Sequence, residues 1–298
     1  MKKFTTFFAI TLATALVFAA KPSSEYPMLK ITPVRSKIWK DVPAMKGLSS
    51  RLDYYKPIQK TSDAAVIVCP GGSYHHLGMG HEGKDVALWF CSKGISAFVL
   101  KYRVSGNGWH HPAMLQDIQR AVQLVRQNAA SYGINPDKIG AIGFSAGGHL
   151  VLMAAEFSGQ DELKKLGIDA GVSLAPNFIV PVYPVVSMQD DIAHVRSRKS
   201  LLDKDQSQAR KDMLSLELHA DKIKCPVFLI TNKDDRTVDW HNSERMDMAM
   251  SRAGVAHVFV LGEKGDHGFG MGNNEFVHTT KWNDNLLLPW LKEIGVIK

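Results

Sequence analysis

The pentapeptide at residues 143–147 most constrains how this chain can fold, because it places a serine between a strand-like and a helix-like segment. It reads G-F-S-A-G, with an apolar run at 138–142 before it and an apolar helical pattern at 148–155 after it. G-x-S-x-G in this setting is typical of a sharp strand-to-helix turn that exposes a strained serine between two glycines. The same letters also occur by chance as a plain glycine-rich turn. Ser145 is therefore predicted to be a nucleophile if the chain also supplies its partners.

Those partners follow in the order that a serine nucleophile on a parallel sheet requires, an acid and then a histidine. A buried strand at 225–231 leads into a loop that contains Asp235. A second strand, 257–261, leads into the glycine-rich loop that contains His267. We therefore predict that Ser145, Asp235 and His267 form a catalytic triad.

The oxyanion donors are predicted upstream, where an apolar strand at 64–69 runs into the sequence P-G-G-S-Y at 70–74. A Pro-Gly-Gly sequence alone is more often only a turn. Upstream of a nucleophile motif, however, it occupies the position of a loop whose backbone N–H groups stabilise a tetrahedral oxyanion. The predicted donors are Gly72 or Ser73, together with Ala146.

Apolar strands and amphipathic helices alternate along the chain, which predicts an α/β fold with a mostly parallel central sheet flanked by helices. Residues 187–221 interrupt the alternation with a polar stretch that is either a small cap insertion over the site or a solvated excursion. We expect one catalytic domain over 21–298, with strands at 64–69, 96–102, 138–143, 178–183, 227–231 and 257–261 and helices at 82–93, 114–131, 146–157, 240–253 and 274–293.

From about Arg51 to the C-terminus, the chain resembles α/β-hydrolases of the esterase/lipase type, close to bacterial acetyl xylan esterase-like and hormone-sensitive-lipase-like enzymes. Two positions depart from the family pattern: Ser73 replaces the third glycine of P-G-G-G-Y, and Asp239 replaces the proline of D-x-x-V-P. Neither departure removes a catalytic atom, because the oxyanion donors are backbone groups. The matching stretches are 52–57, 70–74, 81–83, 98–103, 111–113 with Asp117, 133–139, 143–150, 183–188 and 265–270.

The resemblance also selects among neighbouring acids. Counting back from Val238, the family spacing favours Asp235 over Asp234, which is expected to be a turn acid that bonds its own backbone. Asp266 adjoins His267, but consecutive residues rarely face each other, so it is not expected to orient the imidazole.

The resemblance implies hydrolysis of short acyl esters, most plausibly acetyl esters of plant polysaccharides or oligosaccharides, through a serine ester and without a cofactor. Tyr74 or His76 is expected to line the substrate pocket. A general carboxylesterase or lipase would use the same triad. A serine peptidase or a non-catalytic binding protein of this fold fits the chain less well, because the former usually has a large N-terminal domain and the latter has normally lost a triad member.

Residues 1–20 are predicted to be a secretory signal peptide, because Lys2 and Lys3 precede a short apolar stretch that ends in Ala19 and Ala20. The enzyme is therefore expected to be periplasmic or secreted; an uncleaved membrane anchor is the alternative. The formal net charge of +7 is not concentrated in basic runs with interleaved aromatics, so neither a nucleic-acid partner nor a stable membrane partner is expected.

Cysteines and histidines supply no further predicted site. An odd set, Cys69, Cys91 and Cys225, placed in two expected strands and a helix, is not a disulfide framework. Loop histidines near the expected site raise the alternative of a metal site, but a carboxylate in the ligand set is not evident. We therefore predict no metal; the histidines concerned are His75, His76, His81, His110 and His111.

Overall fold

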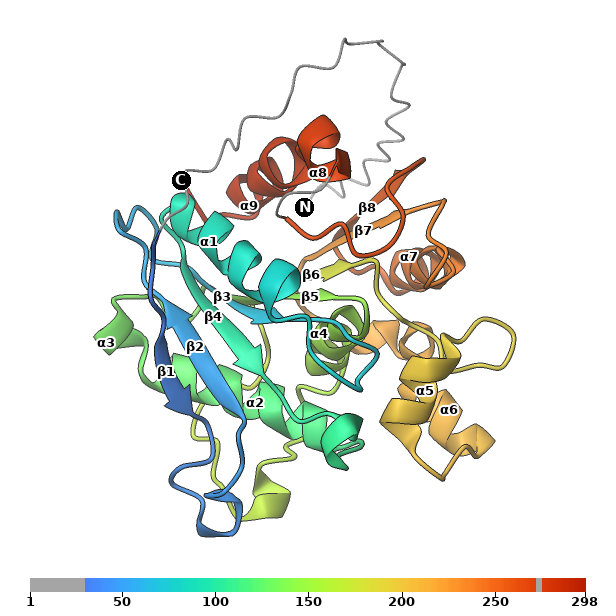
Figure 1. Cartoon of the computed structure of the whole chain (residues 1–298), viewed down its shortest axis with the longest axis horizontal. Coiled ribbons are helices and arrows are strands. Elements are labelled where there is room, and N and C mark those ends of the chain that lie inside the picture. Colours follow the sequence, from blue (N-terminus) through green and yellow to red (C-terminus); the bar gives the residue numbers. More distant parts are fainter. Residues whose placement is uncertain (1–29, 272–274) are drawn as a thin grey trace.

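The computed structural model describes residues 30–271 and 275–298, and the predicted signal peptide lies outside these residues. The described chain forms an eight-stranded sheet in the order β1-β2-β4-β3-β5-β6-β7-β8, covered by helices on both faces (Figure 1). β2 runs antiparallel to β1 and β4, and all other neighbours are parallel. The strands are β1 Val34–Lys37, β2 Arg51–Tyr55, β3 Ala65–Cys69, β4 Ser96–Lys101, β5 Ile139–Phe144, β6 Ile179–Val182, β7 Val227–Asn232 and β8 His257–Gly262.

Central strands are apolar on both sides because each face of the sheet is covered. In β3, Ile67 packs into one core and the adjacent Val66 and Val68 pack into the other, as the alternation of strand side chains requires. Helices α2 Ala113–Gln127, α4 Ala146–Glu156 and α7 His241–Ala253 contribute to the first core, and α1 Asp85–Ser92, α8 Glu275–Thr280 and α9 Leu288–Glu293 contribute to the second.

The parallel strands bring the candidate residues to one edge of the sheet. β3 leads into the loop at 70–74, β5 into Ser145, β7 into the loop that carries Asp235, and β8 into the loop that carries His267. The carboxyl ends of parallel strands share an edge, so residues far apart in the sequence meet there.

Several elements differ from the sequence prediction. The antiparallel strands β1 and β2 were not predicted. The expected helix at 274–293 is broken: Lys281 has φ 46°, and a short π-helix at Asn283–Leu287 precedes α9. The expected helix at 114–131 is likewise divided into α2 and the short α3, Ala129–Tyr132. Cys225 lies outside β7, and all three cysteines are free thiols.

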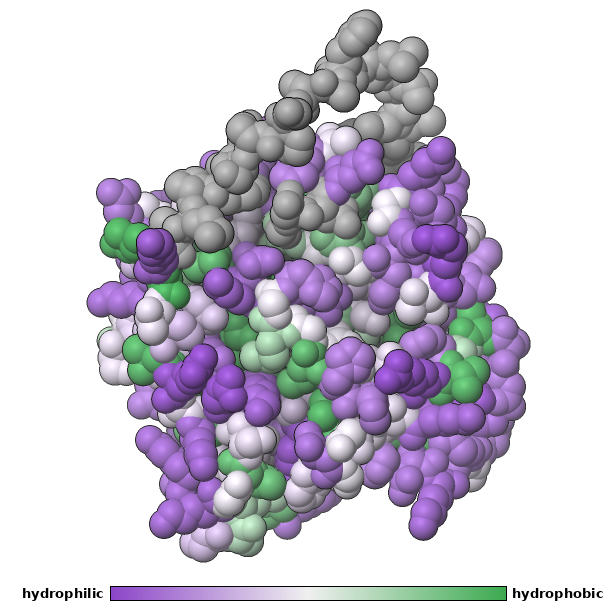
Figure 2. All heavy atoms as spheres, viewed as in Figure 1, coloured by the Kyte–Doolittle hydropathy of each residue, from purple (hydrophilic) through white to green (hydrophobic). Residues whose placement is uncertain are grey.

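The segment at 187–221 contains two short helices, α5 Val195–Leu202 and α6 Gln208–Leu214. It is anchored by buried apolar side chains, including Met188, Leu201 and Leu214. Its outer surface is charged, and the region over α5 and α6 is mainly hydrophilic (Figure 2). Within the described ranges, none of the helices combines the length and the hydropathy needed to span a bilayer.

Candidate active site

Ser145 lies in a strained turn between β5 and α4, with φ 54° and ψ −119°. A non-glycine residue in such a conformation costs on the order of 1–3 kcal/mol, which the surrounding structure must offset. Two backbone hydrogen bonds hold Ser145 in place. Its N–H donates to the Val182 carbonyl at 3.0 Å, and its carbonyl accepts the His149 N–H at 3.2 Å.

Both glycines of the motif are required by close approach. A Cβ on Gly143 would lie 2.0 Å from the Gly147 carbonyl oxygen, and a Cβ on Gly147 would lie 2.0 Å from the Cys69 carbonyl oxygen. Real Cβ contacts are not this short, so either substitution would force backbone to move. The turn thus packs directly against the end of β3, where the predicted oxyanion loop begins.

The structure brings the three predicted triad side chains into hydrogen-bond contact. His267 Nε2 lies 3.0 Å from Ser145 Oγ, and His267 Nδ1 lies 2.7 Å from Asp235 Oδ2. The Asp235 side chain is fully buried, and its other oxygen accepts the N–H groups of Thr237 and Val238, each at 2.9 Å. With Nδ1–H donated to the carboxylate, Nε2 is free to accept the serine proton.

Asp234 has a different role from the one predicted. Its carboxylate accepts the backbone N–H of Gly265 at 3.1 Å and that of Asp266 at 2.8 Å, so it bonds the histidine loop and not its own turn. The sequence could not show this contact, because it joins residues about thirty positions apart. Asp234 therefore fixes the loop that carries His267.

Asp266 also supports this loop from the outside. It accepts the His267 N–H at 2.8 Å and forms a salt bridge with Arg236. Hydrogen bonds from the Arg236 guanidinium lower the pKa of Asp266 to about 2. Its carboxylate bonds the backbone of His267, as expected for a residue that does not orient the imidazole.

Asp239, which departs from the family pattern, lies just before α7 and bonds the first residue of that helix. Its Oδ1 accepts the His241 N–H at 3.0 Å, at the start of α7, and lies 2.6 Å from His241 Nδ1. An aspartate at this position satisfies a helix N–H that would otherwise lack a partner. The change from proline therefore keeps the start of α7 defined.

The predicted oxyanion loop is tightly wound. Gly72, Ser73 and Tyr74 all have positive φ, at 129°, 56° and 58°. The Gly72 carbonyl accepts the His75 and His76 N–H groups, while the N–H groups of Gly72, Ser73 and Ala146 have no hydrogen-bond partner within residues 30–271 and 275–298. Free backbone donors beside a nucleophile are what oxyanion stabilisation requires.

Tyr74 does not line a pocket, contrary to the prediction. Its side chain is fully buried, and its hydroxyl lies 2.9 Å from His149 Nδ1. His149 Nε2 in turn lies 2.9 Å from the Leu214 carbonyl, and burial lowers the pKa of His149 to about 4. A neutral His149 thus donates to Leu214 and accepts from Tyr74, joining the oxyanion loop, α4 and the 187–221 segment.

His76 is exposed, and with His75 it lines a cavity of about 440 Å³ beside Trp109 that no triad residue borders. The loop histidines do not assemble into a ligand set: in the described part of the chain, no three His, Cys, Asp or Glu side chains are grouped so that they could hold a metal ion.

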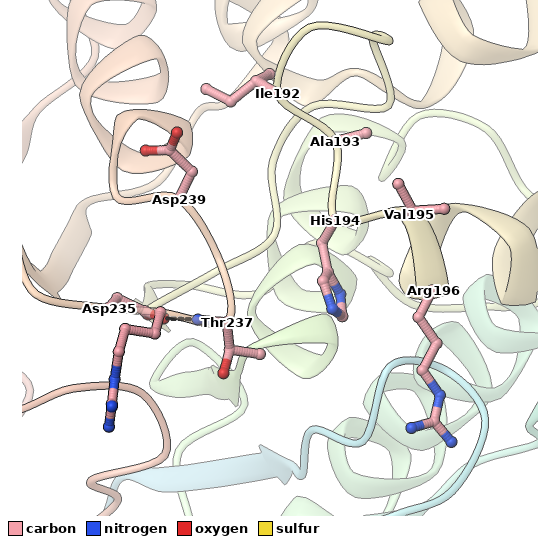
Figure 3. Close-up of a pocket in the computed structure, with 9 residues that line it drawn as sticks. Ile192, Ala193, His194, Val195, Arg196, Asp235, Thr237 and Asp239 are labelled. Atoms are coloured by element: carbon pink, nitrogen blue, oxygen red, sulfur yellow. Dashed lines mark hydrogen bonds between the residues drawn. The ribbon is translucent and has the colours of Figure 1, made fainter.

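A cavity of about 500 Å³ borders the triad where the 187–221 segment meets the Asp235 loop (Figure 3). His194 and Arg196 extend from one wall, and Thr237 lies opposite them near Asp235. Among the described residues, the Arg196 guanidinium has no hydrogen bond or ion pair, unlike that of Arg198 on the same helix. The sequence marks 187–221 as a polar, charged stretch that includes Arg196, but only the fold places His194 and Arg196 near the triad. The lining residues are Ile192, Ala193, His194, Val195, Arg196, Asp235, Arg236, Thr237 and Asp239.

His194 is held by Ser197, whose Oγ lies 2.8 Å from His194 Nδ1. Burial, followed by the charge of nearby His267, lowers the pKa of His194. It is therefore a neutral hydrogen-bonding group at neutral pH.

Comparison with known proteins shows the family of this chain. The BD-FAE family model matches residues 52–250, which is well over half of the chain. The chain belongs to the BD-FAE family. The match covers the oxyanion loop, Ser145 and Asp235, and ends before the loop that carries His267.

Among curated relatives, an acetylxylan esterase of Xylanibacter ruminicola is 30% identical over 250 residues, or 80% of this chain and 48% of the relative. Endo-1,4-beta-xylanase B of Butyrivibrio fibrisolvens is 29% identical over 84% of this chain and 40% of its own length. The chain thus spans half or less of the length of these relatives.

Among solved structures, an acetyl ester-xyloside bifunctional hydrolase from Caldicellulosiruptor lactoaceticus is 33% identical with a TM-score of 0.78, and the match covers 91% of this chain and all of that one. The predicted α/β-hydrolase fold of the esterase type is confirmed.

Proposed function

We propose that this enzyme is an exported serine esterase that removes short acyl groups, chiefly acetyl, from plant polysaccharides or oligosaccharides. The observation that carries the proposal is the pair of hydrogen bonds that join the triad. His267 Nε2 lies 3.0 Å from Ser145 Oγ, and His267 Nδ1 lies 2.7 Å from Asp235 Oδ2. A serine hydroxyl becomes a competent nucleophile when an oriented imidazole can take its proton.

In the proposed reaction, Ser145 Oγ attacks the ester carbonyl carbon while its proton passes to His267 Nε2. The carbonyl electrons move to the oxygen, which is stabilised by the N–H groups of Ala146 and of Gly72 or Ser73. Collapse breaks the bond to the alcohol oxygen, which takes the proton from the imidazolium and leaves. Water then repeats the sequence on the serine ester and releases the acid and free Ser145.

The cavity beside the triad supports a sugar as the alcohol part of the substrate. It presents a neutral imidazole at His194, an unpaired guanidinium at Arg196 and a hydroxyl at Thr237. These groups suit the many hydroxyls of a saccharide, whereas a long acyl chain would favour apolar walls. The acetyl-ester activity named for the relatives points in the same direction.

Export is proposed from the first 20 residues, whose basic start, short apolar stretch and small residues at the end are typical of a secretory leader. N-terminal sequencing of protein recovered from the cell envelope or medium tests it. A mature terminus just after Ala19 or Ala20 supports export, and an intact leader on cytoplasmic protein contradicts it.

The substrate is tested by measuring acetate release from acetylated xylan, acetylated pectin and small acetylated sugars in parallel. We expect acetate from at least one saccharide, and turnover of activated esters that falls as the acyl chain lengthens. Ser145→Ala should reduce kcat by roughly 10⁶-fold, as in serine hydrolases whose nucleophile is removed. A preference for long acyl chains with no acetate from any saccharide would instead indicate a general carboxylesterase or lipase.

A further inference from the structure

A buried carboxylate that the mechanism above does not use lies behind the oxyanion loop. We propose that Glu82 is a positioning residue that fixes the oxyanion loop and the histidine loop relative to each other through Tyr183. This proposal rests on the proposed function, because both concern the same site. One of its two tests, however, needs no carboxylic ester substrate.

Glu82 bonds two segments that flank Ser145. Its Oε2 accepts the Gly71 N–H at 2.8 Å, and its Oε1 accepts the Tyr183 hydroxyl at 2.9 Å. The same hydroxyl accepts the Gly270 N–H at 3.2 Å, just beyond His267. One carboxylate thus joins the start of the oxyanion loop to the end of the histidine loop.

Tyr183 also contacts the imidazole. The centroid of its ring lies 4.6 Å from that of His267 and 4.5 Å from that of Phe269. Burial, and then the adjacent Glu82 carboxylate, raises the pKa of Tyr183 well above its usual value, so the hydroxyl stays protonated and donates to Glu82. The orientation of the tyrosine ring, and of the His267 imidazole that packs on it, therefore depends on Glu82.

On the other side, Gly71 lies directly against the nucleophile. A Cβ built on Gly71 would lie 2.9 Å from the Ser145 Cβ, 2.8 Å from Glu82 Oε2 and 2.7 Å from the Phe144 carbonyl oxygen. A shift of Gly71 would move the next residues, Gly72 and Ser73, which supply the free N–H groups. Catalysis by fixed dipoles is sensitive to such shifts, because the donors must already point at the developing charge.

A buried carboxylate is costly unless its oxygens are bonded, so its retention here calls for an explanation. Glu82 is only 5% exposed, and the exposed His81 lies beside it, with its Nε2 3.7 Å from Oε1. Hydrogen bonds to a charged group are stronger than neutral ones, and here two neutral donors from the site share a single anion. The carboxylate therefore holds the site together more firmly than a neutral side chain would.

Glu82→Gln keeps the size of the side chain but removes its charge and one acceptor oxygen. We expect kcat on an activated acetyl ester to fall roughly 10- to 100-fold with KM within about threefold, the range that loss of a charge-assisted hydrogen bond covers. Tyr183→Phe should produce a similar loss. The double variant should lose little more than the worse single variant, because the two side chains act in one chain of contacts.

Ser50→Ala is the control. The buried Ser50 hydroxyl donates to the buried Asp117 carboxylate at 3.2 Å, so its removal also deletes a buried hydrogen bond to a carboxylate. Neither residue belongs to the oxyanion loop or the histidine loop. Ser50→Ala should lower Tm, as Tyr183→Phe does, but leave kcat within roughly threefold.

Phosphorylation of Ser145 by a dialkyl aryl phosphate, followed by mass spectrometry, gives the second readout. It needs the same nucleophile and oxyanion donors but no carboxylic ester. Slower labelling in Glu82→Gln and Tyr183→Phe, with normal labelling in Ser50→Ala, supports the proposal even if no saccharide ester is hydrolysed. Equal losses in all three variants, or wild-type labelling in Glu82→Gln, would overturn it.

Discussion

The turn at 143–147 that carries the nucleophile is buried and sterically constrained, whereas the 187–221 segment beside the site has an exposed, charged surface. Residues 143–147 are all buried, and two of them must be glycine because carbonyl groups lie where a Cβ would be. The 187–221 segment instead exposes charged side chains, several of them in ion pairs on its surface, such as Arg198 with Asp190. Exposed pairs of this kind contribute little to stability and tolerate change.

From this difference we expect the first region to carry out the chemistry and the second to influence which substrate is bound. Backbone sterics and buried hydrogen bonds fix the nucleophile, the imidazole and the oxyanion donors, which any ester substrate needs. His194 and Arg196 reach the neighbouring cavity from the 187–221 segment. Substitutions in the first region should therefore abolish turnover, whereas substitutions in the second should alter selectivity.

The largest effect separates the two adjacent acids. Asp235→Asn should reduce kcat about 10⁴-fold, because the amide no longer stabilises the imidazolium and favours the wrong tautomer. Asp234→Asn loses bonds only to the backbone of the histidine loop and should cost roughly 10-fold or less in kcat and about 1 kcal/mol of stability. Steady-state kinetics of both variants, alongside thermal unfolding, distinguish them. A severe defect confined to Asp234→Asn would contradict the assignment.

Gly147→Ala tests whether sterics fix the turn. The new Cβ would lie 2.0 Å from the Cys69 carbonyl oxygen and 2.7 Å from that of Pro70, so we expect a loss of at least about 4 kcal/mol of stability or no soluble protein. Gly159→Ala is the control, because nothing lies within 4 Å of its Cβ position. Denaturant unfolding measures both. A Gly147→Ala variant as stable as Gly159→Ala would show that the turn can relax.

His149 joins the two regions and should make stability depend on pH. Burial lowers the pKa of His149 to about 4 in the folded protein. Between about pH 6.5 and 4, this residue is therefore protonated more in the unfolded chain than in the folded chain. Stability from this residue is complete above about pH 6.5 and falls by roughly 3 kcal/mol as the pH drops to about 4. His149→Gln should flatten this part of the curve, as measured by denaturant unfolding at several pH values.

The flattening should be partial, because His111 acts in the same direction. Burial, followed by the charge of Arg210, lowers the pKa of His111 to about 3. An unchanged slope in His149→Gln would mean that the bridge from Tyr74 to Leu214 does not depend on a neutral imidazole.

The smallest effect concerns the 187–221 segment. Arg196→Ala should reduce kcat/KM for acetylated oligosaccharides by roughly 3- to 10-fold, the worth of one hydrogen bond, while leaving p-nitrophenyl acetate hydrolysis unchanged. Lys199→Ala, on the same helix α5 but outside the cavity lining, is the control. Equal losses on both substrates would place Arg196 in the reaction machinery and weaken the division between the regions.

Sequence patterns could predict what local chemistry determines. The periodicity of strands and helices predicted the parallel sheet. The serine between glycines, followed by an acid and a histidine in that order, predicted the three side chains that lie in contact in the structure. The antiparallel strands β1 and β2 were missed because they lie outside the alternating pattern. The break at Lys281 was missed because its left-handed backbone has no glycine to mark it.

Contacts between distant loops could not be predicted in the same way. Glu82 and Tyr183 are 101 residues apart, and neither stands in a pattern that indicates their hydrogen bond. Tyr74 was expected in the pocket, but it has a positive φ and its side chain lies in the core against His149. Such placements depend on how the whole sheet brings its loops together.

The most direct test of the account is to trap the serine ester. Wild-type enzyme mixed rapidly with an activated acetyl ester, quenched early and digested, should yield the Ser145 peptide carrying one added acetyl group, with a burst of released alcohol close to one per active site. Ser145→Ala should show neither the burst nor the modified peptide. Full acetyl-ester turnover with Ser145 unmodified, or retained turnover in Ser145→Ala, would contradict the assignment of Ser145 as the nucleophile.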